Sequence, residues 1–130
     1  MKDSPVSNFP HCLRVLIVDD EPMIANTLAQ ILNASGFEAR AVYNGENAVE
    51  VAAELKPDVL LTDVIMRGIS GIEVAMQVSD KLPSCRVILF SGQATTSDLL
   101  EPAKKKGRNF EILTKPIHPK DLLNILTACD

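Results

Sequence analysis

The stretch "PDVLLTDVIMRGISG", residues 57–71, begins like a buried β-strand and then meets a carboxylate. Val59, Leu60 and Leu61 form an apolar run of the kind found in strands covered on both faces, and Asp63 follows closely. An unpaired charge in such a place costs free energy. Other groups are therefore expected to converge on Asp63, and the rest of the sequence has to supply them.

The rest of the chain alternates strand-like and helix-like segments. The expected strands are 13–18, 37–42, 58–62, 86–91 and 110–114, and the expected helices are 23–36, 44–55, 71–82, 96–107 (interrupted by Pro102) and 118–129. Five strand–helix units in succession predict an α/β fold, with a parallel sheet between two layers of helices. The segment 37–42 alternates apolar and polar residues, which predicts an edge strand.

Composition and charge limit the classes of protein to which this chain can belong. With 130 residues, the chain predicts one globular domain at 13–130 after a polar tail at 1–12. The net charge of −4 argues against a nucleic-acid partner. No apolar window is long enough for a membrane span, and the tail lacks a signal-peptide core. Three cysteines at unrelated spacings indicate reduced thiols and a cytoplasmic location.

Polar side chains follow four of the five expected strands. Asp19 and Asp20 come after the first, Asp63 after the third, Ser91 at the end of the fourth and Lys115 after the fifth. Ligands of open parallel sheets bind outside the carboxyl ends of the strands. We therefore expect these side chains to gather at one edge of the sheet.

This set of groups suits phosphoryl transfer to a carboxylate. Clustered carboxylates repel one another, and Mg²⁺, which binds carboxylates and phosphate oxygens, relieves that repulsion. Asp63 would be the nucleophile and, being ionised at neutral pH, would need no general base. Lys115 would neutralise one phosphoryl oxygen, and the Ser91 hydroxyl would donate to another.

Each feature also has a simpler interpretation on its own. "DDEP" (19–22) is typical of a helix start, with a capping Asp before a first-turn Pro. Ser91-Gly92 is typical of a turn, a single lysine is usually solvated, and "KKKGR" (104–108) is typical of a helix end. The histidines and cysteines lack zinc-site spacing, and no nucleotide-binding glycine motif is present. Only the combined set indicates phosphoryl transfer.

Four motifs, in order and spacing, resemble the receiver domain of two-component response regulators. They are "VLIVDDEP" (15–22), "LLTDVIMRGISG" (60–71), "ILFSG" (88–92) and "LTKP" (113–116). The resemblance covers about residues 13 to 129. It implies the flavodoxin-like doubly wound (βα)5 fold, a five-stranded parallel sheet of order 2-1-3-4-5 with helices on both faces.

The resemblance also implies a role for each site residue. Asp63 matches the phosphoacceptor, Ser91 the hydroxyl switch residue and Lys115 the phosphate-contacting lysine, whose peptide bond to Pro116 would be cis. The implied magnesium ligands are Asp19, Asp20, Asp63 and the backbone carbonyl of Ile65.

Three departures from the family pattern concern output rather than chemistry. Arg67 stands where the family usually has Pro. Ile112 stands where it usually has Phe or Tyr, and the nearest aromatic residue is Phe110. The segment from Gly107 to Lys115 is one residue longer than usual. We expect the site chemistry to be intact and the conformational response to be altered.

The favoured function is a stand-alone bacterial response regulator receiver, a signalling domain rather than a classical enzyme. It would take a phosphoryl group from a sensor histidine kinase or a histidine phosphotransfer protein, lose it slowly, and act on a downstream protein or through a phosphorylation-dependent homodimer. One alternative is a pseudo-receiver that binds partners without phosphorylation. Another is an aspartate-based phosphatase, disfavoured because Val64 and Ile65 replace the second acid of that class.

Overall fold

The computed structural model describes residues 13–92, 101–107 and 110–127, and its centre is a five-stranded parallel sheet. The strands are β1 (Arg14–Val18), β2 (Glu38–Val42), β3 (Val59–Asp63), β4 (Arg86–Ser91) and β5 (Glu111–Thr114). Their order is β2-β1-β3-β4-β5, with every neighbouring pair parallel. The flavodoxin-like order implied by the sequence is confirmed, and the polar strand β2 lies at an edge.

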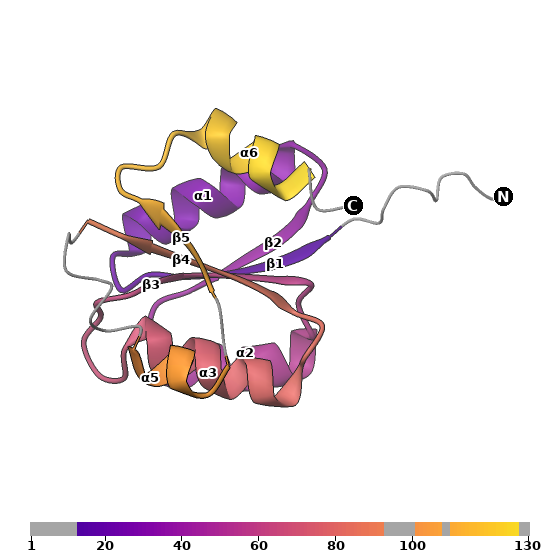
Figure 1. The fold of residues 1–130 in the computed structure, drawn as a ribbon. Helices are drawn as coiled ribbons and strands as arrows, with labels where there is room; N and C mark the ends of the chain where they lie inside the picture. The colour runs from indigo at the N-terminus through magenta and orange to yellow at the C-terminus, as the bar shows by residue number, and fades with distance from the viewer. Residues whose placement is uncertain (1–12, 93–100, 108–109, 128–130) are drawn as a thin grey trace, which may run out of the picture.

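Helices cover both faces of the sheet, as predicted (Figure 1). They are α1 (Pro22–Ala34), α2 (Gly45–Leu55), α3 (Gly71–Lys81), α5 (Glu101–Lys105) and α6 (Pro119–Thr127). In Figure 1, α1 and α6 lie on one face, and α2, α3 and α5 lie on the other. The doubly wound architecture therefore has a two-sided core.

The core consists of two apolar clusters, one on each face. β3 contributes to both: Leu60 belongs to the cluster under α2 and α3, and Leu61 to the cluster under α1 and α6. All five β3 residues are buried, because successive side chains point to opposite faces and both faces are covered. β2 alternates exposed and half-buried residues up to its buried last residue, Val42, which explains its more polar sequence.

The element boundaries agree with the sequence within two residues in most places. α2 begins after Asn44, whose side chain accepts a hydrogen bond from the Asn47 amide at 2.7 Å, and α1 ends before Gly36, which has φ of +99°. The expected helix 96–107 is seen as α5 only; its first part, like the tail 1–12, lies outside the described residues.

The start of α1 corrects one interpretation of the sequence. Taken alone, "DDEP" predicts a capping aspartate, but the residue that precedes the helix is Glu21, and it makes no side-chain cap. Pro22 is the first helical residue, as expected. The side chains of Asp19 and Asp20 instead contact Lys115 and Arg67, in the site described next.

Candidate functional site

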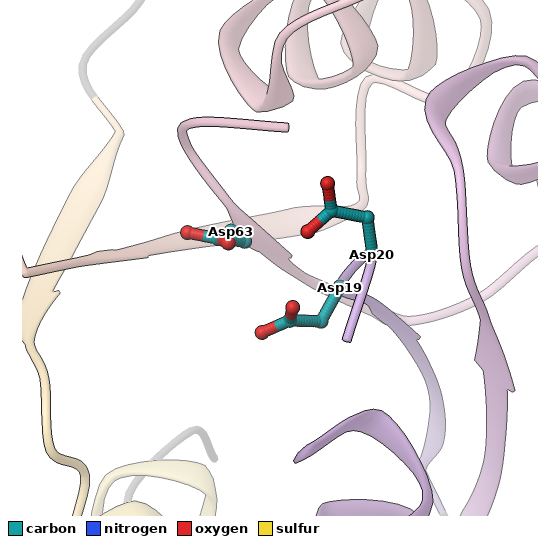
Figure 2. A group of neighbouring side chains, drawn as sticks. All are labelled: Asp19, Asp20 and Asp63. Atoms are coloured by element: carbon teal, nitrogen blue, oxygen red, sulfur yellow. The ribbon is translucent and has the colours of Figure 1, made fainter. Parts of the chain in front are cut away.

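Three carboxylates meet at the carboxyl edge of the sheet (Figure 2). Asp19 and Asp20 follow β1, and Asp63 is the last residue of the neighbouring strand β3. The parallel register pairs Val18 with Thr62, which sets Asp19 beside Asp63. One carboxylate oxygen from each aspartate lies within 4.8 Å of the other two. The structure therefore brings together the acidic group expected from the sequence.

Lys115 reaches this group from the end of β5. Its Nζ lies 3.2 Å from Oδ2 of Asp19 and 3.3 Å from Oδ2 of Asp63. The Lys115 amide donates to the Ser91 carbonyl at 2.9 Å, and the Lys115–Pro116 peptide is cis, as the resemblance implied. The lysine is thus anchored to the end of β4 and paired with two carboxylates.

The ionisation of Asp63 and Lys115 depends on their burial and on the charges around them. Burial raises the pKa of Asp63 above its usual value; Lys115 opposes this rise, while Asp19 and Asp20 add to it. Burial alone would lower the pKa of Lys115, but the Asp63 and Asp19 carboxylates raise it above the usual lysine value. The site is therefore short of positive charge: the lysine is held protonated, and Asp63 ionises less readily than an exposed aspartate.

Asp20 has a different cationic partner. The main-chain N–H of Arg67 donates to Oδ2 of Asp20 at 3.1 Å, and the Arg67 Nε–H donates to the same oxygen at 3.3 Å. In the sequence, Arg67 is only a departure from the family pattern, and no contact is predicted for it. Strand order could not reveal this pairing, because Arg67 lies in the loop after β3, whose path the sequence does not define.

The loop after β3 is held tightly against the strand end. The Gly71 amide donates to the Val64 carbonyl at 2.8 Å, and a Cβ atom on Gly71 would lie 1.8 Å from the Asp63 carbonyl oxygen. No other residue type fits at this position without displacing the backbone that carries Asp63. The Ser70 hydroxyl then accepts from the Glu73 amide and starts α3.

The remaining predicted residues lie at the same edge. Ser91, 3% exposed, ends β4, and Ile65 lies in the loop after Asp63 with 53% of its surface exposed. Phe90 was not expected in the site: its fully buried ring lies 5.0 Å from Lys115 Nζ, in cation–π range. The sequence signal for Phe90 was only that of a core strand residue.

The acidic group fits a hard divalent cation on its own chemistry. Oxygen donors are what Mg²⁺ prefers, and three carboxylates converge within one ion's reach. The Asp19 side chain is fully buried, and a single lysine serves both Asp19 and Asp63. A buried excess of negative charge of this kind is stabilised by a bound cation.

Comparisons with known proteins agree with this architecture. Residues 15–127 match the family model of the response regulator receiver domain. The chemotaxis protein CheY of Thermotoga maritima is 32% identical over 114 residues, which cover 87% of this chain and 93% of that protein. The DNA-binding response regulator MtrA of Mycolicibacterium smegmatis is 28% identical over 112 residues, and the chain spans about half of its length, 47%.

A solved structure gives the same result in three dimensions. The response regulator TrrA of Thermotoga maritima superimposes with a TM-score of 0.75 at 28% identity, over 89% of this chain and 97% of that chain. In the part of the chain that the structure describes, no helix has the length and apolarity needed to cross a membrane. The chain belongs to the response regulator receiver domain family of two-component signalling systems.

Proposed function

We propose that this receiver accepts a phosphoryl group on Asp63 from the phosphohistidine of a sensor histidine kinase or a histidine phosphotransfer protein. The observation that carries the proposal is the position of Asp63, which ends the central strand with Lys115 Nζ at 3.3 Å and two further carboxylates in reach. Receiver domains are signalling domains in which phosphoaspartate and magnesium are typical. The residues of this chain match that chemistry.

In the proposed transfer, a carboxylate oxygen of Asp63 attacks the phosphorus atom. A P–O bond forms, the P–N bond of the phosphohistidine breaks, and its electron pair returns to the leaving imidazole. Lys115 neutralises a phosphoryl oxygen, and the Ser91 hydroxyl donates a hydrogen bond to another. Asp63 needs no general base, because the attacking form is the ionised carboxylate.

The proposed metal ligands are the carboxylates of Asp19, Asp20 and Asp63 and the backbone carbonyl of Ile65. When bound, Mg²⁺ would neutralise the carboxylate cluster and the charge that develops on the transferred group. The solved structure of TrrA is of a complex with Mg²⁺ and a beryllium fluoride, which supports the same ion for this chain. Asp19 would be held in place by the Glu21 amide, which donates to its Oδ1 at 2.9 Å.

We further propose that the receiver comprises residues 13–130 after a tail at 1–12, and that it acts in the cytoplasm. It would catalyse its own phosphorylation and a slow dephosphorylation, and signal by contact with a downstream protein or a second copy of itself. The pseudo-receiver alternative gains no support from the site, since the three expected acids lie together and Lys115 pairs with two of them.

The proposal is tested by incubating the protein with Mg²⁺ and acetyl phosphate and measuring the intact mass. We expect a gain of one phosphoryl group that maps to Asp63, is lost in Asp63→Asn and survives in Asp58→Asn. Asp58 is a matched control because it is an exposed aspartate at the opposite end of the same strand. No gain in the wild type would favour the pseudo-receiver, and catalytic turnover of phosphomonoesters would favour the phosphatase.

A further inference from the structure

Two cations divide the three carboxylates of the site between them. Lys115 pairs with Asp19 and Asp63, and Arg67 pairs with Asp20. Three negative and two positive charges leave the group with a formal charge of −1. Among the described residues, Lys115 does not form an ion pair with Asp20. Asp20 forms its ion pair with Arg67 instead.

The contact of Arg67 is directed at one atom. Its main-chain N–H and its Nε–H both donate to Oδ2 of Asp20, at 3.1 and 3.3 Å. Asp20 is one of the three carboxylates that the proposed function gives to Mg²⁺. A guanidinium and a metal ion that approach the same carboxylate weaken each other's binding to it, because like charges repel at such a distance.

The two side chains differ in exposure in a way that favours exchange. The Arg67 side chain is 87% exposed, whereas that of Asp20 is 19% exposed. An ion pair whose cation is exposed is screened by water, so releasing the Arg67 guanidinium into solvent costs little free energy. Asp20 stays where it is, because it lies only two residues after β1, while Arg67 lies in the loop between β3 and α3.

We infer that Arg67 is the cation that pairs with Asp20 when no metal is bound, and that Mg²⁺ displaces the Arg67 side chain from Asp20. Arg67 thereby lowers the magnesium affinity of this receiver. The inference rests on the proposed magnesium-dependent function and deepens it. Without metal, the guanidinium reduces the repulsion among the carboxylates. With metal, the arginine side chain turns to solvent, and its charge still opposes the ion.

The test is a magnesium titration by calorimetry of the wild type and two variants. Arg67→Gln removes the charge but keeps a polar side chain. We expect this variant to bind Mg²⁺ between roughly twofold and tenfold more tightly, because one unit charge near a divalent ion in a water-like medium has an effect of that size. Arg67→Lys keeps the charge and should stay close to the wild type. The gain in Arg67→Gln should shrink as salt is raised, because salt screens exposed charges.

The matched control is Arg40→Gln, which makes the same change of net charge at an exposed position in the middle of edge strand β2. It should change the affinity by less than the site variant. A second readout is the Arg67 Nε–Hε resonance in NMR, which should move towards the position of a solvated arginine when Mg²⁺ is added to the wild type.

The outcomes separate this inference from the proposed function. Saturable Mg²⁺ binding with equal or weaker affinity in Arg67→Gln would overturn the role of Arg67 and leave the magnesium site standing. An equal gain in Arg40→Gln would show that only net charge matters and would also overturn it. Absence of saturable binding in both the wild type and Arg67→Gln would overturn the proposed metal dependence and this inference with it.

Discussion

The ammonium Nζ of Lys115 lies 3.3 Å from Oδ2 of Asp63, although β4 separates the strands that carry the two residues. The contact is made at the carboxyl end of β4, where the strand ends in the small residue Ser91 and Gly92 follows. The Lys115 side chain therefore crosses over the end of β4 to reach the end of β3. Its amide, which donates to the Ser91 carbonyl, fixes where that crossing begins.

We expect Asp63→Asn to remove phosphorylation and to stabilise the metal-free fold at neutral pH. Burial raises the pKa of Asp63, so the folded protein holds this proton more tightly than the unfolded chain does. Ionisation of Asp63 therefore costs stability, and that cost grows as pH rises from the ordinary aspartate pKa through the raised folded value. The gain from Asn, on the order of 1 kcal/mol, is measured by urea unfolding at pH 7 with chelator present.

The same measurement at low pH is the control for this prediction. Below the ordinary aspartate pKa, the carboxyl is protonated in both states, and the difference between the wild type and Asp63→Asn should disappear. A variant that is less stable at pH 7, or equally more stable at every pH, would contradict the electrostatic explanation.

Lys115→Met is expected to destabilise the fold by about 1–3 kcal/mol, because buried Asp19 and Asp63 lose their cation. The raised pKa of Lys115 means that its contribution is fully present below the ordinary lysine pKa and is lost only as pH rises through the higher folded value. The loss should therefore be constant across neutral pH and shrink in strong alkali. Urea unfolding between pH 6 and 11 checks both statements.

A double-mutant cycle tests whether this loss comes from the ion pair. Asp19→Asn in the Lys115→Met background should cost less than Asp19→Asn in the wild type, because the unpaired charge is removed. Additive effects of the two substitutions would show that the side chains act on stability separately.

Asp20→Ala should weaken Mg²⁺ binding by roughly tenfold or more, since even the loss of a group that only orients a metal ligand has such effects. Calorimetry measures the change, with Asp58→Ala as the control carboxylate outside the site. In the Asp20→Ala background, Arg67→Gln should have a smaller further effect, because the arginine no longer competes with the ion for Asp20 and only its charge remains. Unchanged magnesium affinity in Asp20→Ala would show that Asp20 is not a ligand.

The fold and the acidic group could be predicted because both follow from local patterns and parallel register. Asp19 and Asp63 each follow a recognisable strand, and parallel pairing brings their strand ends together. The Arg67–Asp20 contact could not be predicted, because it depends on the path of the loop between β3 and α3. The cap of α1 was misread for a related reason: Asp19 accepts a hydrogen bond from Glu21 while its other oxygen faces Lys115, an arrangement set by the tertiary structure.

The last prediction concerns the response to phosphorylation. Ile112 pairs with Leu89 and is 41% exposed on edge strand β5, and Phe110 packs against the cluster under α2 and α3. In the switch that the family resemblance implies, the Ser91 hydroxyl would turn towards the phosphoryl group, and an aromatic ring at position 112 would fill the space it leaves. The branched aliphatic side chain of Ile112 cannot replace that ring, and Phe110 lies one residue before β5. We therefore expect beryllofluoride with Mg²⁺ to produce smaller changes in hydrogen exchange at 108–125 than at 64–70 and 91–97, and Ile112→Tyr to enlarge them. Changes of equal size in the wild type would show that the aromatic residue at this position is dispensable, because the two-state shift would then reach β5 and α6 without it.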